Sequence, residues 1–296
     1  MMKKLLLVLS WLLPISVLAQ QPADTVKVWK KGGVASLNFS QVSLSNWSAG
    51  GKSSASGTIL INTFANYTKN RISWDNTLDL GYGILKEEGD KYTKSDDKID
   101  LNSKVGYKTN SLIYYTILFN FRSQFTNGYN YPERDNPISR FLAPGYFTLA
   151  LGADYKPNDS FSLFVSPLTG KMTVVTDDDL SDDGAFGVDP GKKSREELGS
   201  FLKSQFKTEI MKNVNFQTQI DLFSNYLDKP GNIDVHWDVM INMKINDYLS
   251  ANLMTNLIYD DDIKIQKDNN DDGIVDEAGP RVQFKEVFSL GFNYKF

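Results

Sequence analysis

The sequence predicts an all-β protein, a transmembrane antiparallel up-and-down β-barrel of about 12 strands. Three observations support this prediction. Apolar and polar residues alternate along most of the chain, which is the pattern of strands that have one face in lipid. The segments between the alternating runs are short and long in turn. The printed sequence also closes on an alternating run whose last residue is aromatic, Phe296, which is typical of outer-membrane barrels.

The alternating segments define the expected strands. In the clearest one, 71–85, Trp74 and Tyr82 share one face while Asp75 and Asp79 share the other. Segments of this length suit tilted bilayer spans, which need roughly 9–11 residues, and exceed the usual soluble strand of about 5–6 residues. In chain order, the expected strands cover 33–43, 53–67, 71–85, 97–108, 112–127, 145–156, 160–175, 198–211, 214–227, 232–245, 249–259 and 284–296.

The connections between these strands indicate an orientation. Short turns are expected at 68–70, 109–111, 157–159, 212–213 and 246–248. Long polar loops are expected at 44–52, 86–96, 128–144, 176–197, 228–231 and 260–283. Outer-membrane barrels have short periplasmic turns and long extracellular loops. An even number of strands therefore places both ends of the barrel on the periplasmic side.

Aromatic residues on the apolar face are expected at two rims. Near the periplasmic rim they are Tyr67, Trp74, Tyr107, Tyr155, Tyr294 and Phe296, and near the outer rim they are Tyr82, Tyr226, Trp237 and Tyr259. Aromatic girdles at both membrane interfaces are typical of barrels. The alternative is a soluble sheet with cross-strand aromatic pairs. Such a sheet has no reason to alternate short and long connections so strictly.

The first residues have the pattern of a secretory signal peptide. Lys3 and Lys4 precede an apolar stretch from Leu5 to Leu18, and Ala19 follows as the small residue at the expected cleavage site. The stretch is shorter than the roughly 20 residues that a membrane-spanning helix needs. We therefore expect secretion and residence in the outer membrane of a Gram-negative bacterium. The predicted organisation is a signal peptide at 1–19, a periplasmic segment at 20–32 and a barrel at 33–296.

The composition excludes some chemistry. The chain has no cysteine, which rules out disulfides and thiolate metal clusters. Its formal net charge of −4 argues against nucleic-acid binding, because such binding depends on neutralising phosphates with lysine and arginine.

The polar face of the strands is expected to line the lumen, and it carries both signs of charge. Eight strands already fill a barrel with side chains, so about 12 strands leave room for a water-filled path unless loops fold inward and plug it. Both outcomes are open from the sequence. The expected lumen-facing residues are Asp75, Asp79, Asp100, Lys104, Arg122, Asp154, Lys203, Lys207, Glu209, Asp221, His236, Asp238 and Lys244.

His236 is the only histidine, and it is the natural base for an enzymatic alternative. An outer-membrane enzyme that acts on lipid needs a base and a nucleophile at the lipid-facing surface. The alternation places His236 on the lumen face, and the nucleophile motif G-x-S-x-G does not occur in the sequence. A pore-lining or structurally paired histidine fits better, and no catalytic constellation is predicted.

The last long loop contains a pattern typical of calcium loops. Oxygen ligands are expected from Asp268, Asn270, Asp272 and Asp276 and from the backbone carbonyl of Ile274. Gly273 occupies the position of the sharp turn, but Gly279 replaces the glutamate that usually completes such a site. We expect either a weak calcium site at 268–277 or a solvated acidic loop. No other cofactor is predicted.

Four segments outside the alternating pattern carry a resemblance to a known family. They are the runs Asn46–Gly51, Ser166–Lys171, Gly184–Lys192 and Gly279–Glu286. Together they are similar to an outer-membrane family of Bacteroidota that is described only as a domain of unknown function, DUF3078. The resemblance implies an outer-membrane barrel and supplies no catalytic residues. Read physically, Pro167 predicts a bulge or bend, since proline cannot donate to the strand ladder, and the glycines of 184–192 permit a compact loop that could enter the lumen.

The sequence therefore predicts porin-like passage of small solutes or a structural role. The alternatives are an enzyme acting on lipid or glycan, and a binding protein that uses calcium-ordered surface loops. The expected partners are outer-membrane lipid and, through the last strand, the barrel-assembly machinery. The solute and the oligomeric state do not follow from the sequence.

Overall fold

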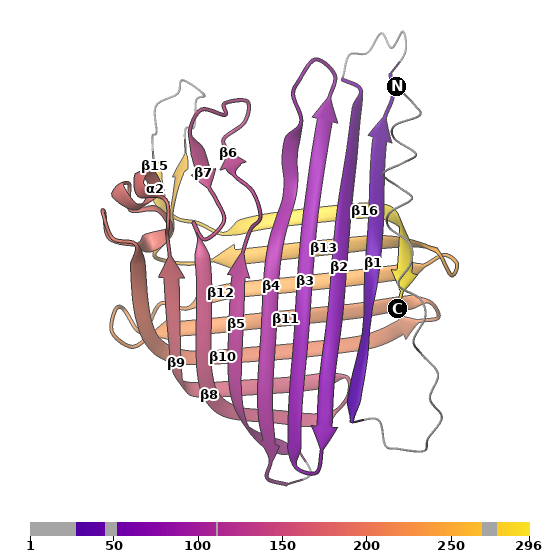
Figure 1. Ribbon diagram of the computed structural model, residues 1–296, viewed down its shortest axis with the longest axis vertical. Helices are drawn as coiled ribbons and strands as arrows, with labels where there is room; N and C mark the ends of the chain where they lie inside the picture. The colour runs from indigo at the N-terminus through magenta and orange to yellow at the C-terminus, as the bar shows by residue number, and fades with distance from the viewer. Residues whose placement is uncertain (1–27, 45–51, 111, 268–276) are drawn as a thin grey trace.

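The computed structural model describes residues 28–44, 52–110, 112–267 and 277–296, and these form a closed antiparallel barrel (Figure 1). Its twelve strands follow one another around the barrel in chain order, and β1 pairs with β16 to close it. The predicted fold class, strand number and up-and-down topology are confirmed. The barrel strands are β1 (Trp29–Val42), β2 (Ser54–Lys69), β3 (Ile72–Glu87), β4 (Thr93–Lys108), β5 (Ile113–Ser123), β8 (Gly145–Asn158), β9 (Phe161–Val174), β10 (Ser194–Met211), β11 (Val214–Asn225), β12 (Asp234–Lys244), β13 (Leu249–Tyr259) and β16 (Gln283–Lys295).

Short elements in the long loops were not predicted. They are the hairpin of β6 (Gly128–Tyr129) and β7 (Pro137–Ser139), the hairpin of β14 (Lys264–Lys267) and β15 (Glu277–Pro280), the helix α2 (Asp178–Asp182) and the 3₁₀ turn η1 (Ala185–Gly187). Elements of so few residues leave no periodicity in the sequence. Across the described ranges, no helix is long and apolar enough to cross a membrane. The predicted signal peptide at 1–19 lies outside the described residues, and β1 begins at Trp29 rather than at the expected residue 33.

Each short turn is built around an asparagine. Asn70 and Asn213 have φ angles of 55° and 68°, in the left-handed region that asparagine tolerates better than most residues. The side-chain oxygens of Asn110, Asn158 and Asn246 instead accept hydrogen bonds of 2.8–3.0 Å from backbone N–H groups two and three residues further on. These local hydrogen bonds give partners to backbone N–H groups at the points where the strand ladder stops.

The outer surface of the barrel is apolar on every side. A surface of this extent is unfavourable in water and suits the hydrocarbon of a bilayer. At the short-turn end, the Trp29 ring lies 5.2 Å from that of Tyr67 and 5.7 Å from that of Trp74, as expected for an interfacial aromatic girdle. Exposed apolar residues around the barrel include Ile59, Val105, Ile117, Leu149, Val165, Phe206, Trp237 and Phe288.

The bulge expected at Pro167 lies in β9. The pairing with β8 jumps from Leu151–Leu168 to Ala153–Val165, and the pairing with β10 shifts nearby. The Ser166 hydroxyl lies 2.7 Å from the Leu151 carbonyl and 2.9 Å from the Leu168 carbonyl. The next residue, Pro167, has no backbone N–H to donate to the strand ladder, which is where the bulge forms. The bulge bends β9, and Lys171 lies further along this strand, at the long-loop end of the barrel.

The closing seam between β1 and β16 depends on a residue without a side chain. Gly33 and Phe296 exchange two backbone hydrogen bonds of 2.9 and 3.1 Å. A Cβ atom at Gly33 would lie 2.6 Å from the Phe296 ring and 2.7 Å from the Asn62 carbonyl. The terminal aromatic ring therefore packs where only glycine fits.

We expect Gly33→Val to weaken closure of the barrel, because the new side chain displaces Phe296 and crowds the backbone of β2. The fraction of protein that migrates as a folded, heat-modifiable barrel on gels should fall at least several-fold. Gly170→Val is the matched control, since a Cβ atom there meets no other atom within 4 Å. Equal folded fractions for the two variants would contradict this account of the seam.

Candidate functional site

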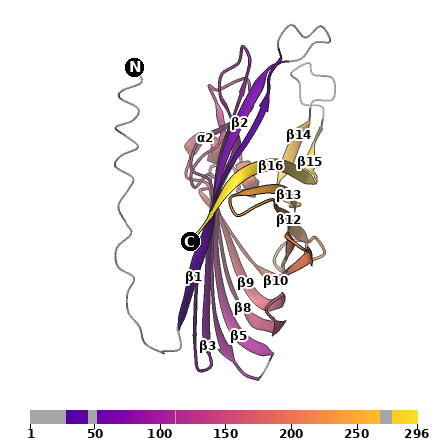
Figure 2. The same cartoon turned by 90° about the vertical axis from the view of Figure 1, so that its right-hand side faces the viewer.

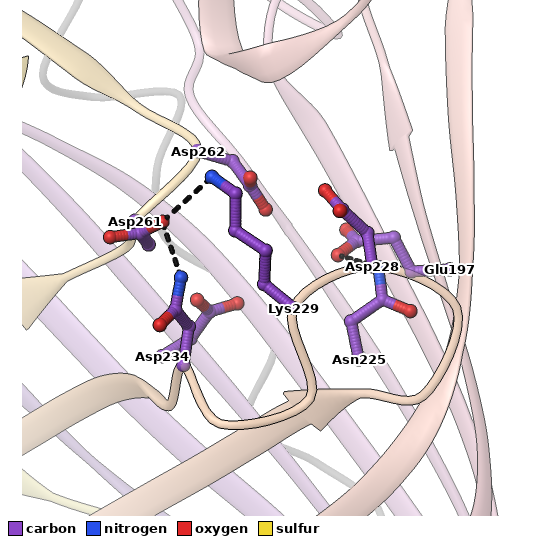
Figure 3. Close-up of a pocket in the computed structure, with 8 residues that line it drawn as sticks. Glu197, Asn225, Asp228, Lys229, Asp234, Asp261 and Asp262 are labelled. Carbon is purple, nitrogen blue, oxygen red and sulfur yellow. Dashed lines mark hydrogen bonds and ion pairs between the residues drawn. The ribbon is translucent and has the colours of Figure 1, made fainter.

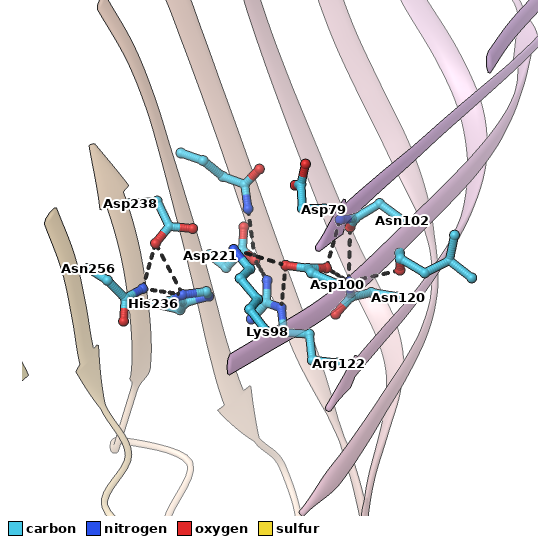
Figure 4. A network of polar contacts seen from close by, with 12 residues as sticks. Asp79, Lys98, Asp100, Asn102, Asn120, Arg122, Asp221, His236, Asp238 and Asn256 are labelled. Atoms are coloured by element: carbon cyan, nitrogen blue, oxygen red, sulfur yellow. Dashed lines mark hydrogen bonds and ion pairs between the residues drawn. The ribbon is translucent and has the colours of Figure 1, made fainter. Parts of the chain in front are cut away.

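The centre of the lumen holds a network of buried charges (Figure 4). Arg122 on β5 bonds Asp100 on the neighbouring strand at 3.2 Å and Asp221 on β11 at 2.6 Å. Asp221 also pairs with Lys203 at 3.2 Å, and Asn120 donates to Asp100 at 2.7 Å. Charges buried this deeply are stable only when they are paired and hydrogen-bonded.

Two ion pairs join opposite walls of the barrel. Three strands separate β5 from β11, so the contact between Arg122 and Asp221 has to cross the interior. Lys285 on β16 likewise reaches Asp96 on β4 at 2.5 Å, across β1, β2 and β3. In Figure 1, β2 to β5 run up the picture and β10 to β13 run across it behind them. The side chains of these two pairs therefore extend across the lumen.

A second cluster lies towards the short-turn end. Lys104 pairs with the buried Asp154 at 2.6 Å. Lys156 bonds the same carboxylate at 3.3 Å and Asp75 at 2.7 Å. The residues come from β3, β4 and β8, so this cluster also bridges strands that are not neighbours in the barrel.

A third cluster, at the long-loop end, is predominantly acidic, and we call it the mouth cluster. Lys171 lies at its centre and contacts Asp234 at 2.6 Å, Asp260 at 3.4 Å and Glu197 at 3.5 Å. Arg195 pairs with Glu197 at 3.1 Å and with Asp262. With the adjoining Asp261 included, the mouth cluster comprises Lys171, Arg195, Glu197, Asp234, Asp260, Asp261 and Asp262.

A small pocket opens beside the mouth cluster (Figure 3). Lys229, on the loop between β11 and β12, donates to Asp261 at 3.3 Å, and Asn232 donates to the same carboxylate at 2.5 Å. The hydrogen bond and attraction of Asp261 raise the pKa of Lys229 above its ordinary value. Lys229 therefore stays charged at neutral pH and offsets part of the acidic surface.

The long loop at 175–193 packs against the preceding loop at this end of the barrel. Val175, Leu180 and Val188 form a small apolar core with Ala143 from the preceding loop. Gly184, Gly187 and Gly191 have positive φ angles, so the glycines of the motif permit this compact path. The Gly187 carbonyl accepts a bond of 3.3 Å from Arg195, which attaches the loop to the mouth cluster.

The predicted lumen residues separate into two groups. The structure brings together Asp100, Arg122, Lys203 and Asp221, and it pairs Lys104 with Asp154. Asp79 contacts Asn62 on the neighbouring strand. Lys207, Glu209 and Lys244 instead lie exposed near the short-turn rim, apart from the buried clusters. Several charged residues of these clusters were not predicted from the sequence. Most of them lie near the ends of the expected strands, where the apolar–polar alternation stops. They are Lys98, Lys156, Lys171, Arg195, Glu197, Asp234 and Lys285.

His236 faces the lumen network rather than the lipid (Figure 4). Its Nε2 lies 2.7 Å from the Asn256 amide nitrogen and 3.4 Å from Asp238. Asn256 also donates to Asp238 at 2.5 Å. Within the described part of the chain, no hydroxyl group hydrogen-bonds to this histidine, so the contacts do not form a nucleophile–base pair.

The expected calcium ligands at 268–276 lie outside the described residues, so that site stays a prediction. Among the residues that are described, no group of three or more histidine, cysteine, aspartate or glutamate side chains has the geometry to hold a metal ion.

The fold and the lumen define a class of protein, an integral β-barrel of the outer-membrane type. Residues 39–129 match the family model described as "Protein of unknown function (DUF3078)", which confirms the predicted resemblance over that segment. No curated protein matches the sequence significantly.

Several solved barrels are similar in structure. The COG4313 outer membrane channel from Pseudomonas putida F1 is 12% identical, with 94% of this chain and 100% of that chain covered and a TM-score of 0.41. The translocator domain of the autotransporter NalP from Neisseria meningitidis is 8% identical, with 92% and 90% covered and a TM-score of 0.38. A FadL homologue from Pseudomonas aeruginosa is 10% identical, with 90% and 89% covered and a TM-score of 0.29. The barrel assignment rests on the strand pairing of this chain and does not depend on these similarities.

We expect Arg122→Ala to destabilise the barrel by about 3–5 kcal/mol, because it leaves Asp100 and Asp221 buried without their shared cation. Urea unfolding in lipid vesicles, followed by tryptophan fluorescence, measures the change. Lys244→Ala is the control, since its partner Asp247 is exposed and exposed ion pairs contribute little to stability. An Arg122→Ala variant within about 1 kcal/mol of the wild type would show that the network contributes little.

Proposed function

We propose that this protein is an outer-membrane barrel that passes small polar solutes through a lumen closed at rest by ion pairs. The observation that carries the proposal is the set of pairs that cross the lumen, above all Arg122 with Asp221 at 2.6 Å. A purely structural plug could be apolar and dry. Charged side chains can exchange their partners for water, so a polar lumen can hydrate when these pairs separate.

The charges of the lumen bear on the class of solute. The central network mixes both signs, which favours neither anions nor cations strongly. The mouth cluster carries five carboxylates against Lys171, Arg195 and the adjoining Lys229, and the remaining negative charge would repel anions that approach from the long-loop side. Small uncharged or zwitterionic solutes fit this lining best.

The location follows the same reasoning. The apolar outer surface suits a bilayer, and short periplasmic turns with long extracellular loops give the orientation. We propose that the chain is secreted with a cleaved signal peptide and is inserted by the barrel-assembly machinery, which would contact the last strand.

The other functions have less support. An enzyme acting on lipid or glycan would need a base at the lipid surface, whereas His236 contacts Asn256 and Asp238 inside the barrel. A purely structural barrel is the main competitor, because it would have the same fold and the same lumen. A transport measurement separates the two.

We expect the double variant Arg122→Ser with Asp221→Asn to raise single-channel conductance in planar bilayers at least threefold over the wild type. The two changes together remove a bridge across the lumen without leaving Asp221 charged and unpaired. Lys203 and Asp100 each lose one partner, so heat-modifiable migration has to show first that the variant is folded. Proteoliposomes should swell faster with small sugars. The surface variant Lys244→Ala should behave as the wild type. If neither wild type nor double variant passes ions or sugars while both remain heat-modifiable, the structural role is favoured.

Deletion of residues 178–192 should also raise conductance, because this loop contacts Arg195 of the mouth cluster. The measurement is again single-channel conductance. Replacing Phe186 with serine, which loosens the loop's apolar packing without shortening the chain, is the milder companion variant. Unchanged conductance after the deletion would show that the loop lies beside the path rather than across it.

A further inference from the structure

His236, the only histidine in the sequence, lies between two carboxylates in the lumen (Figure 4). Asp238 follows on the same strand, and its Oδ1 lies 3.4 Å from the Nε2 atom of the ring. Asp221 is the residue directly opposite on β11 in the strand register. Residues that face each other in this way have Cβ atoms roughly 4.5–5.5 Å apart, so the ring and the Asp221 carboxylate lie within reach of each other.

The hydrogen bonding of the His236 ring is incomplete. The Asn256 amide nitrogen lies 2.7 Å from Nε2 and also donates to Asp238 at 2.5 Å. Because Nε2 then accepts a hydrogen bond, the neutral ring carries its proton on Nδ1. Nδ1 is buried and has no hydrogen-bond partner among the described residues. A buried N–H group without an acceptor is unfavourable, so the neutral ring is poorly satisfied at this position.

The facing residue, Asp221, has an oxygen without a hydrogen bond. Its Oδ2 accepts from the Arg122 guanidinium at 2.6 Å. Its Oδ1 lies 3.2 Å from the Lys203 ammonium nitrogen, yet it accepts no hydrogen bond within the described part of the chain. Two register-paired residues thus have a buried nitrogen and a buried carboxylate oxygen that both lack hydrogen-bond partners. A protonated ring has an N–H group on each nitrogen, and in this position a carboxylate is close to each one.

The charges around His236 leave room for one more positive charge. On its own strand, Asp234 is already paired with Lys171 in the mouth cluster, and the neighbouring β13 presents the neutral Asn256. Figure 2 shows β12 and β3 on opposite sides of the barrel, and β4 lies opposite β12 in the strand order. With the groups that face His236 from β3, β4, β5, β10 and β11 included, the central network has three cations and four carboxylates. They are Lys98, Arg122 and Lys203, and Asp79, Asp100, Asp221 and Asp238. A proton on His236 balances these charges.

We propose that His236 binds a proton in the folded barrel and that the charged ring replaces Arg122 as the partner of Asp221, which opens the lumen in mildly acidic conditions. Asp221 is then held by Lys203 and His236, from the two strands that flank its own. Arg122 keeps Asp100, on the strand next to its own, and the charged ring repels the guanidinium. A pair that crosses the lumen is thereby exchanged for pairs within each wall. The effect on passage rests on the proposed function, whereas the protonation and the exchange of partners do not.

A single histidine makes the protonation directly measurable. The full-length protein, labelled with ¹⁵N-histidine and free of any histidine tag, is placed in nanodiscs, and NMR follows its two ring nitrogens. Between about pH 7.5 and pH 5, the range in which histidine changes charge, we expect the signals to move from those of a neutral ring to those of a charged ring. The barrel should stay heat-modifiable throughout. A ring that remains neutral at the acidic end of this range would overturn the proposal.

A double-mutant cycle tests the exchange of partners. Arg122→Ser, Asp221→Asn and the double variant are compared with the wild type by urea unfolding in lipid vesicles at both ends of the pH range. The coupling between the two residues should fall by about half or more at acidic pH, because Arg122 no longer contacts Asp221. In a His236→Gln background the coupling should be the same at both pH values. Wild-type coupling that does not change with pH would overturn the proposal.

Single-channel conductance in planar bilayers tests the consequence for passage. Wild-type conductance should rise at least twofold between about pH 7.5 and pH 5. His236→Gln, whose side chain cannot be protonated, should show no such rise, and Lys244→Ala should respond as the wild type, since its pair with Asp247 is exposed. Equal responses of the wild type and His236→Gln would overturn the proposal. A protein that conducts at neither pH would instead contradict the proposed passage, and the ring-nitrogen signals and the double-mutant cycle would then decide this inference.

Discussion

The hydrogen bonding of the backbone in lipid is the constraint on which the rest of this structure depends. An unpaired N–H or C=O group in hydrocarbon costs several kcal/mol, so a sheet that crosses a membrane has to close on itself. The contact between Gly33 and Phe296 completes that closure at one end of the seam. The five short turns, each with an asparagine that satisfies or bends the backbone, keep neighbouring strands in register so that the ladder can close.

Closure creates a second problem, because the polar face of every strand is then enclosed. This chain solves it by pairing charges across the interior. Arg122 is held by carboxylates from two walls, and Lys171 is surrounded by three carboxylates near the mouth. Pairing satisfies these charges, while a small apolar cluster of Leu118, Ala150 and Phe164 packs elsewhere in the barrel. The stability of the barrel and the passage that we propose thus depend on the same side chains.

Two of the irregular places in the wall have different consequences. The bulge at Ser166 and Pro167 is locally satisfied, since the Ser166 hydroxyl reaches two neighbouring carbonyls. The end of the β1–β16 pairing is not, since Asn38 and Ser289 remain without partners among the described residues. The first irregularity lies in the strand that carries Lys171, whereas the second marks where β16 leaves β1.

The sequence by itself determined the barrel. A strand with one face in lipid needs a strict alternation of apolar and polar residues, and every short turn needs a residue that tolerates the backbone conformation of the turn. Both are local properties that can be read along the chain, as the segment from Trp74 to Tyr82 and the turn at Asn70 illustrate. It also placed Arg122 and Asp221 on the inner face. Only the tertiary structure decided that they meet, because partners separated by 99 residues depend on the shear and closure of the whole barrel. The same holds for the seam, since the point where β1 and β16 part is set by how the two ends of the sheet come together rather than by either strand alone.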